Sequence, residues 1–571
     1  MSLFIRKTPT KNGRIFVSIV DGRYSKAKKN TTQKTYKSYG YLDELEKVYT
    51  DPIAYLNDVC KKENEKRKTR KKEPIPMGKP ELINLGYFPY KRLYSELKVK
   101  QFLDAIQIYE GTKSEYILSD IFEALIYSRV ISPSSKIESY HKTIPSFFHN
   151  FNFKSNQMYK AISLLGKKQY DEVIFEGIRK EYEKNYLVKK ERVYFDCTNF
   201  YFEIDKPTDF LKPGPSKENR PNPLIGLGLL MDQEGVPIAY KLYPGNESEK
   251  PVFGQVLTEM KEQFKVKEKV IRVADKGLNC SSNIVKTYVE NDGYIFSESV
   301  RGANNEVKQW ILDPEGYQTV TDQDGEVIYK YKTKVDYFNR VNINDRTDKK
   351  EYREIPQKRV VFWSKDYAIK TKLERERVIA KQEKALRQES TYKTTKYGFG
   401  SKYIQEEILD KNGELLDATK ERFIDFEKVK NDEQLDGFNM LVTSELNAPA
   451  TEIIDTYKTL WKIEESFRIL KTTLVTRPIH HTKLEGIKGH FLICMTALFL
   501  TRIIEIKKLK GEVSASAAIR SLREYKAIKL GEDNYQLVYI DEVLEKFAMY
   551  FSVRLNEHFK NEKEILKLFK N

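Results

Sequence analysis

The chain has 571 residues, and its 100 lysines and arginines outnumber its 83 aspartates and glutamates, which leaves a net charge of +17. One hydrophobic core does not extend over such a length, so we expect roughly three or four domains. Four widely separated cysteines argue against a disulfide scaffold or a cysteine zinc site and favour an intracellular protein. The basic balance fits nucleic acid as a partner, although a general lysine bias would produce the same charge.

The N-terminal residues divide into two predicted parts. Residues 1–75 are predicted to form a small β-hairpin module and a basic linker, with a turn at Asp21 and Gly22 between strand-like segments. The charge run at 61–73 is interpreted as a solvated helix end or linker, with a phosphate-binding arm as the alternative. Residues 76–188 carry helical patterns and are predicted to form a helical region.

The pattern changes to strands at Arg192. Residues 189–300 predict three strands, a helix, a strand, a helix and another strand, which together indicate a mixed α/β sheet. Residues 301–436 interrupt this order and predict a mainly β insertion with a charged helix at about 366–388. Residues 437–510 begin with a returning strand, "GFNMLVTSE", and complete the α/β domain.

The stretch "YKTLWKIEESFRILKTTL", residues 457–474, predicts one amphipathic helix. Its apolar stripe consists of Leu460, Ile463, Phe467, Leu470 and Leu474. Helical phase places Glu464 at the border of this stripe, in line with Tyr457 and Lys471, and directs Glu465 toward solvent. An ordinary ion pair of Glu464 with Arg468, one turn along the helix, is the alternative interpretation.

The most apolar stretch is "GHFLICMTALFLTRIIEI", residues 489–506. Polar residues such as His490 and Arg502 interrupt it, so we interpret it as a buried core helix and not as a membrane span. Residues 511–571 are predicted to form a C-terminal helical region with at least two helices and a strand, and dimerisation is a candidate role for it.

Two aspartates interrupt apolar strand patterns. Asp196 lies within "VYFDCT", and Asp275 ends "IRVAD" just before a turn. A carboxylate in a buried strand is costly unless it is paired or bound to a cation, although Asp275 also fits a turn or helix cap. With Glu464 these residues form a set of oxygen ligands that suits Mg²⁺ or Mn²⁺. Three carboxylates with two such ions are suited to phosphoryl transfer.

The order Asp196, Asp275, Glu464 resembles the DDE triad of bacterial insertion-sequence transposases of the IS-four group. These enzymes carry Tyr, two residues, Arg, three residues, Glu, six residues and Lys, and Tyr457, Glu464 and Lys471 match this pattern. Leu460 stands at the arginine position, and Lys462 and Arg468 are the candidate substitutes. Further similar segments are "GLLMDQEGVPIAYKLYPGNES", "VADKG" and "GFNMLVTSE".

The resemblance implies an α/β fold, with a ribonuclease-H-like mixed sheet interrupted by a mainly β insertion. The N-terminal hairpin module and a helical DNA-binding region at 76–188 would precede it, and the helical tail would follow. The implied function is cut-and-paste DNA transposition. Such an enzyme binds terminal inverted repeats, cleaves the transposon ends and joins the 3′-hydroxyls to target DNA.

The resemblance also assigns roles to residues and partners. Asp196, Asp275 and Glu464 would hold two Mg²⁺ ions, which Mn²⁺ can replace, while Tyr457 and Lys471 would contact DNA. Double-stranded DNA and a second copy of the chain would be the partners, in the bacterial cytoplasm and at the nucleoid, with no membrane partner. Two tryptophans of the insertion are candidates for holding a flipped base or, in the simpler interpretation, for the core: Trp310 and Trp363.

Two other functions remain open at this stage. A metal-dependent nuclease would use the same carboxylates for hydrolysis without joining strands, so the triad alone does not separate it from a transposase. A catalytically inactive DNA-binding protein would keep only the basic surface.

Overall fold

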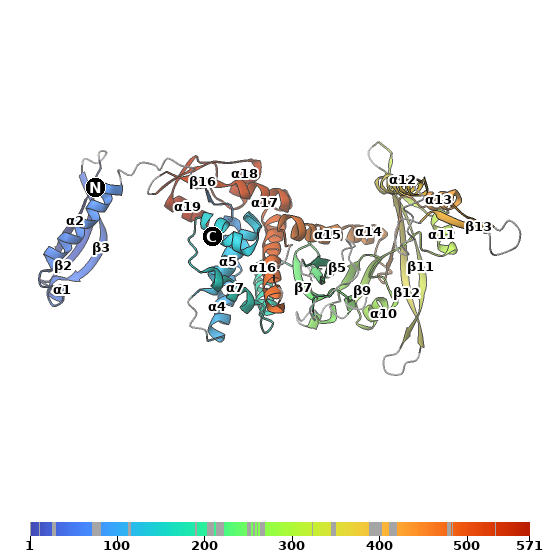
Figure 1. Ribbon diagram of the computed structural model, residues 1–571, viewed down its shortest axis with the longest axis horizontal. Helices are drawn as coiled ribbons and strands as arrows, with labels where there is room; N and C mark the ends of the chain where they lie inside the picture. The colour runs from blue at the N-terminus through green and yellow to red at the C-terminus, as the bar shows by residue number, and fades with distance from the viewer. Residues whose placement is uncertain are drawn as a thin grey trace. The chain divides into compact units, whose positions relative to one another are not determined.

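The computed structural model describes most of the chain (Figure 1). The described residues are 2–10, 12–25, 30–70, 82–111, 116–188, 191–202, 210–212, 222–247, 253–254, 257–259, 261–262, 269–321, 324–343, 350–387, 402–409, 419–476, 481, 483–530 and 533–570. The chain forms two compact units. The first comprises residues 1–83, 526–538 and 557–567, and the second comprises 84–525, 539–556 and 568–571.

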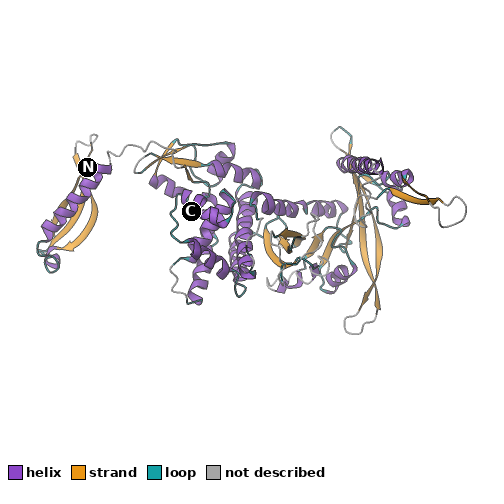
Figure 2. Ribbon diagram, in the orientation of Figure 1, coloured by secondary structure: helices purple, strands orange, loops and turns teal. Residues whose placement is uncertain are grey.

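The N-terminal module is a three-stranded antiparallel sheet with a helix packed on one face (Figures 1 and 2). The expected turn at Asp21 and Gly22 is wrong, because both residues lie inside the second strand and pair with the first. Residues 71–81, which include the predicted boundary at 75, lie outside the described residues. The elements are β1 (Ser2–Pro9), β2 (Ile15–Ser25), β3 (Asn30–Tyr41), α1 (Leu42–Leu45) and α2 (Pro52–Arg70).

The first unit also contains a four-stranded sheet in the order β18-β17-β16-β4. The C-terminal region, predicted with at least two helices and one strand, contains three of these strands, which all follow residue 511. Each has only three or four residues, too few for an alternating pattern to stand out. The strands are β4 (Leu82–Asn84), β16 (Lys526–Lys529), β17 (Asn534–Leu537) and β18 (Phe559–Asn561), and α19 (Glu562–Leu568) follows them.

In the second unit, helices surround the long apolar helix α16 (Leu484–Ile503). Residues 484–508 are long and apolar enough to cross a membrane, but 94% of the apolar window is buried inside the protein, as expected for a core helix. A Cβ on Gly489 would lie 2.0 Å from the carbonyl oxygen of Ile162, so the glycine permits close packing with α7. The other helices are α3 (Phe88–Glu96), α4 (Val99–Tyr109), α5 (Leu118–Ile131), α6 (Lys136–Glu138), α7 (Ser155–Leu165), α8 (Tyr170–Asn185), α17 (Ala515–Glu524) and α18 (Glu542–Tyr550).

A half-buried histidine in this helical region, His149, predicts a pH dependence of stability. The Tyr87 hydroxyl accepts the His149 backbone N–H at 3.0 Å and lies 2.7 Å from Nδ1, which it donates to when the ring is neutral. Burial, helped by Lys91, lowers the pKa of His149 from its usual 6.5 to about 4. Between these values the unfolded chain binds a proton that the folded chain does not. The His149 contribution to the free energy of unfolding therefore decreases as pH falls from 6.5 to 4.

Urea unfolding at several pH values measures this effect. His149→Asn, which keeps an acceptor for Tyr87, should have a flatter dependence of unfolding free energy on pH than the parent. His141 is exposed, so His141→Asn is the matched control and should follow the parent. Parallel curves for the parent and His149→Asn would contradict the prediction.

A nine-stranded mixed sheet forms the centre of the α/β part, in the order β10-β11-β12-β15-β9-β8-β5-β6-β7. Strand β8 is parallel to both β5 and β9, and the remaining neighbours are antiparallel. The predicted succession of strands is confirmed, while the helix expected after β7 lies largely outside the described residues. The elements here are β5 (Arg192–Tyr201), β6 (Leu224–Met231), β7 (Pro237–Pro244), β8 (Ile271–Ala274), α10 (Ser281–Val289), β9 (Gly293–Glu298) and β15 (Phe438–Thr443).

The insertion extends this sheet, because residues 358–363 of β12 pair with residues 438–443 of β15. It contains the expected charged helix, α12, and two helices that the sequence patterns did not indicate, α11 and α13. Its elements are α11 (Asn305–Leu312), β10 (Gln318–Thr321), β11 (Val327–Ile343), β12 (Lys350–Ser364), α12 (Lys365–Arg387), β13 (Ile404–Leu409), β14 (Thr419–Ile424) and α13 (Phe426–Glu433).

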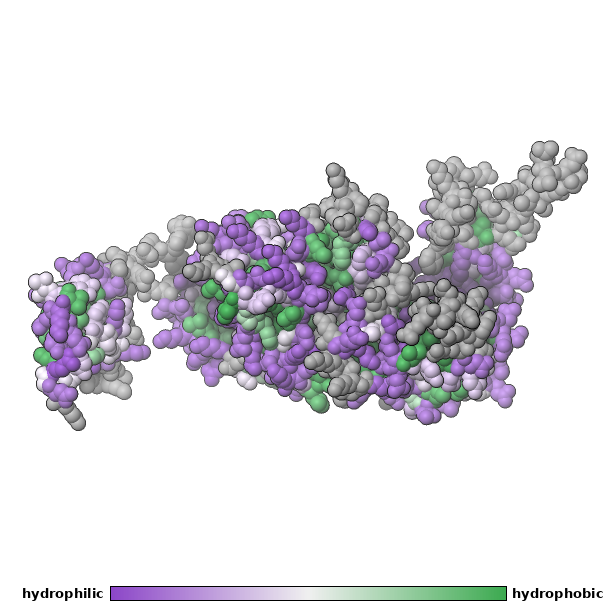
Figure 3. All heavy atoms as spheres, turned by 90° about the horizontal axis from the view of Figure 1, so that it is seen from below, coloured by the Kyte–Doolittle hydropathy of each residue, from purple (hydrophilic) through white to green (hydrophobic). Residues whose placement is uncertain are grey.

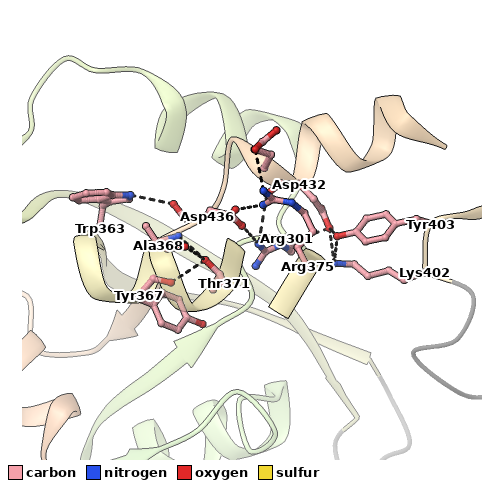
Figure 4. Close-up of polar contacts among 12 residues, drawn as sticks. Arg301, Trp363, Tyr367, Ala368, Thr371, Arg375, Lys402, Tyr403, Asp432 and Asp436 are labelled. Atoms are coloured by element: carbon pink, nitrogen blue, oxygen red, sulfur yellow. Dashed lines mark hydrogen bonds and ion pairs between the residues drawn. The ribbon is translucent and has the colours of Figure 1, made fainter. Parts of the chain in front are cut away.

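A polar network fastens α12 to the start of β15 (Figure 4). Asp436 accepts from Arg301 at 2.8 Å and also pairs with Arg375. The Trp363 indole donates to the Asp436 carbonyl at 3.1 Å, and Trp310 packs against the apolar cluster of the insertion. Both tryptophans therefore make internal contacts, which agrees with the simpler interpretation of these residues.

Candidate active site

Three carboxylates that are far apart in the sequence line one pocket of about 480 Å³. Asp196 lies in β5, Asp275 directly follows β8, and Glu464 lies on the helix α15 (Trp461–Arg468). Strands β5 and β8 are parallel neighbours, and Tyr194 pairs with Val273. Two residues further along each strand, Asp196 and Asp275 therefore come level on the same face of the sheet. The complete lining is Asp196, Asp275, Lys276, Gly277, Leu278, Glu464, Phe467, Arg468 and Lys471.

The alternation of β5 explains how Asp196 reaches this pocket. Phe195 and Cys197 are fully buried in the core on one face of the sheet. Asp196 is half-buried on the opposite face, where α15 packs against β5 (Figure 1). Its Oδ1 accepts the backbone N–H of Cys197 at 2.8 Å.

Asp275 is held by a residue that the sequence patterns did not indicate. Its Oδ1 accepts the Lys276 N–H at 2.6 Å and the Ser297 hydroxyl at 3.0 Å. The hydroxyls of Ser297 and Tyr457 are hydrogen-bond partners, and burial raises the pKa of Tyr457. Ser297 lies on β9, next to β8 in the sheet, so only the strand pairing places it beside Asp275.

Removal of the Ser297 hydroxyl is expected to slow the chemistry without unfolding the protein. Ser297→Ala would free the Asp275 carboxylate to rotate, and the loss of one orienting group of this kind costs about 10- to 100-fold in activity or metal affinity. Rates of the phosphoryl transfer expected from the three carboxylates, measured against divalent ion concentration, test this. Ser297→Thr, which retains the hydroxyl, should preserve more activity than Ser297→Ala. Equal rates for the parent and Ser297→Ala would remove Ser297 from the site.

The two adjacent glutamates have opposite environments, and the prediction for Glu465 is wrong. Glu464 is exposed at the pocket, whereas the Glu465 side chain is only 11% exposed. Glu465 accepts from Arg468 at 3.3 Å and from Arg502 of α16 at 3.1 Å. The ion pair expected between Glu464 and Arg468 thus belongs to Glu465. The cause is tertiary, since α16 covers the side of α15 that helical phase alone assigns to solvent.

The predicted single helix at 457–474 is also wrong in detail. Tyr457 belongs to α14 (Ala450–Lys458), and α15 begins at Trp461 and runs into a π-helical turn, η5 (Ile469–Thr473). Between α14 and α15, the N–H of Leu460 donates to the carbonyl of Tyr457, three residues earlier. This spacing is that of a 3₁₀ turn, which is wound more tightly than an α-helix. This junction changes the phase along the helix, so one helical wheel does not describe both Tyr457 and Glu464.

Basic side chains surround the carboxylates. Lys276, Arg468 and Lys471 line the pocket, and the Lys471 ammonium lies 5.6 Å from the centre of the Phe200 ring. Lys462 instead donates to the Glu234 carbonyl at 3.0 Å, and burial lowers its pKa. Of the proposed DNA contacts, the structure brings Arg468 and Lys471 to the pocket and Tyr457 beside it. Lys276, in "VADKG", is an additional candidate.

The donor set of the pocket suits a hard cation in chemical type, because it offers carboxylate oxygens without cysteine or histidine. Among the described residues, however, no three acidic, cysteine or histidine side chains stand close enough together to hold an ion. The three carboxylates would therefore have to converge around a metal.

Solved structures of transposases are among those to which the chain is similar. It is similar to the piggyBac transposase synaptic complex with hairpin DNA, at 9% identity and TM-score 0.36, over 86% of this chain and 87% of that chain. It is also similar to the Mos1 mariner paired end complex with Mn, at 14% identity and TM-score 0.15, over 28% of this chain and 54% of that chain. No curated protein matches.

The sequence family gives a more direct result. Residues 207–500, more than half of the chain, match the transposase DDE domain. The match contains Asp275 and Glu464 and starts after Asp196. The chain belongs to the transposase DDE domain family.

Proposed function

We propose that the protein is a cut-and-paste DNA transposase of an insertion sequence of the IS-four group. It would bind the terminal inverted repeats, cleave the ends and join the 3′-hydroxyls to target DNA. The observation that carries the proposal is the pocket in which Asp196, Asp275 and Glu464 meet basic side chains, within a chain of the DDE family. Three antiparallel strands followed by two parallel ones support the ribonuclease-H-like arrangement.

In the proposed mechanism, Asp196, Asp275 and Glu464 would hold divalent ions, two Mg²⁺ in the proposal. Bound ions of this kind activate a water or 3′-hydroxyl and stabilise the leaving oxygen in phosphoryl transfer. Ser297 and Tyr457 orient the Asp275 carboxylate. The positive charges at the pocket would bind DNA phosphates, and they belong to Lys276, Arg468 and Lys471.

The partners proposed are transposon-end and target DNA, and a second copy of the chain in the paired-end complex. The proposed location is the bacterial cytoplasm. A nuclease of the same fold is the second candidate function, because hydrolysis needs the same three carboxylates.

A strand-transfer assay with the element's own ends separates these functions. With Mg²⁺ or Mn²⁺, the transposase should release the ends and join them to a supercoiled target, and removal of the metal by a chelator should stop both reactions. Cleavage without joined products would favour the nuclease. Asp196→Asn and Asp275→Asn should each abolish both steps, and retained cleavage in either variant would contradict the proposed site.

A further inference from the structure

Two arginines hold the end of the helix that carries Glu464. This helix continues as η5, which ends at Thr473, and the Thr473 carbonyl accepts from the Arg523 guanidinium at 2.8 Å. Two residues further on, the Val475 carbonyl accepts from Arg129 at 3.1 Å. Arg523 comes from α17 and Arg129 from α5, so two helices of the helical region contact this segment. Because the last carbonyls of a helix lack partners within it, such donors satisfy them.

Further hydrogen bonds hold the same segment. The Thr476 carbonyl accepts from Nε2 of His490 at 3.1 Å, and the Thr476 N–H donates to the Leu470 carbonyl at 3.0 Å. Burial lowers the pKa of His490 well below its usual value, so its ring is neutral and carries its proton on Nε2. The Nε of Arg523 also donates to the Val130 carbonyl at 2.9 Å, which ties the end of η5 to α5.

The two arginines interact mainly with these carbonyls. Arginine is usually a surface residue, and hydrophilic residues make up most of the coloured surface in Figure 3. Arg129 is instead only 5% exposed, and burial lowers the pKa of Arg523. Neither arginine forms an ion pair with a carboxylate among the residues that the structure describes. Burying a guanidinium without an acid is costly, so charge pairing does not explain why these arginines lie here.

Val475 has a backbone conformation that valine rarely adopts. Its φ is +45°, in the left-handed region, where the Cβ of a β-branched residue crowds its own backbone. The side chain is 37% exposed, so its packing contributes little to holding this conformation. Strained residues persist only where their surroundings fix them, and they are frequent at functional sites. The hydrogen bonds from Arg523 and Arg129 fix the backbone just before Val475 and at Val475 itself.

The held segment directly follows residues of the candidate active site. Lys471 lies in η5, two residues before Thr473, and both Lys471 and Glu464 line the pocket. Among the described residues the acidic side chains stand too far apart to share an ion, so the position of α15 is critical for the geometry of a metal site. A misplacement of about 1 Å, even when a distant substitution causes it, can cost about 10²-fold in rate.

We propose that Arg523 and Arg129 are positioning residues for the phosphoryl transfer. They hold residues 473–476 in the strained conformation and thereby fix the places of Glu464 and Lys471 at the pocket. Neither arginine lines the pocket, so each acts through the helix and not by contact with the DNA. This inference deepens the proposed function and rests on it, because it presupposes a reaction at Glu464.

Arg523→Met in the full-length protein tests the proposal. Methionine keeps an unbranched side chain but donates no hydrogen bond, so the Thr473 carbonyl loses its partner. At saturating DNA and Mg²⁺, the rate constant of end cleavage should fall about 10- to 100-fold. The Kd for DNA, measured by fluorescence anisotropy, should change much less, because only the phosphate contact of Lys471 is affected. Arg523→Lys keeps a donor but not the fork that reaches two carbonyls, so its rate should lie in between.

Arg92→Met is the matched control. Arg92 lies in the same helical region and donates to the carbonyls of Leu568 and Phe551, each at 2.8 Å, but it does not contact the segment after η5. This variant should lose stability in a similar way and still cleave at the parental rate. Circular dichroism at the assay temperature shows whether each variant is folded. If Arg523→Met does not fold, Arg523→Lys is compared with Arg92→Lys instead.

Val475→Gly combined with Arg523→Met provides a second test. Glycine adopts positive φ without a steric cost, so the segment keeps its conformation with less support. The double variant should therefore recover part of the cleavage rate that Arg523→Met loses. If Arg523 served only the stability of the fold, the glycine would not restore the rate constant of the folded protein.

Three results would overturn the inference: a parental rate in Arg523→Met, an equal loss of rate in Arg92→Met, or no recovery in the double variant. Failure of the proposed function gives a different result. A parent protein that neither cleaves nor joins DNA would refute that function, and with it the assignment to phosphoryl transfer. Hydrogen exchange of residues 469–476 needs no activity, and it should still be faster in Arg523→Met if the arginine holds the segment.

Discussion

Glu464→Gln is expected to abolish DNA cleavage and strand transfer while leaving folding and DNA binding nearly unchanged. Glutamine keeps the shape of the side chain but removes the negative charge that the proposed metal site requires. We expect a loss of about 10²- to 10³-fold, the usual cost of removing one group that stabilises charge in a transition state. Glu464 is exposed at the pocket, so little packing is lost with its charge.

Glu465→Gln is the matched control, one residue away on the same helix. Its carboxylate accepts from Arg502 and Arg468 and is absent from the pocket lining. This variant should therefore cleave DNA at close to the parental rate once it is folded, with reduced stability. End cleavage and anisotropy measured side by side distinguish the two. Loss of activity in Glu465→Gln with retention in Glu464→Gln would show that the third ligand is assigned to the wrong glutamate.

Arg502→Met is expected to lower the free energy of unfolding by about 3 to 5 kcal/mol, the usual cost of breaking a buried ion pair from one side. Arg502 is 2% exposed and donates to Glu465 at 3.1 Å, to Glu505 at 2.6 Å and to the Gly235 carbonyl at 3.2 Å. Without it, two largely buried carboxylates lose their cation. Urea unfolding monitored by circular dichroism measures the loss.

The double variant Arg502→Met with Glu465→Gln provides the decisive comparison. Removing both charges leaves fewer unpaired carboxylates than removing Arg502 alone, so the double variant should be more stable than Arg502→Met. Arg468→Gln, which removes an exposed partner of Glu465, should change stability by about 1 kcal/mol or less. If Arg502→Met is as stable as the parent, the pair does not anchor α15.

Local sequence patterns were sufficient to predict the helices and strands whose formation depends on residues that are close together in the sequence. The apolar strands around Asp196 and Asp275 and the charged helix of the insertion follow from alternation and helical periodicity. Local sequence patterns failed to indicate short strands such as β16. They also placed a turn at Asp21, where pairing with β1 keeps the chain extended.

The candidate site also combines features that the sequence indicates with features that only the tertiary structure provides. The residue types identify three carboxylates with the chemistry of metal ligands, and their order resembles that of the DDE family. Strand register brings Asp196 level with Asp275, and pairing of β8 with β9 adds Ser297. Neither relation is visible in a single segment, because each joins residues distant in the chain.

The sequence by itself determined the basic charge, the mixed α/β character and the three candidate carboxylates. The tertiary structure decided which neighbouring glutamate faces the pocket and which is paired in the interior. Helical phase alone directs Glu465 to solvent, but burial depends on what packs against a helix. Here α16 covers that side with Arg502, which leaves Glu464 as the glutamate at the pocket.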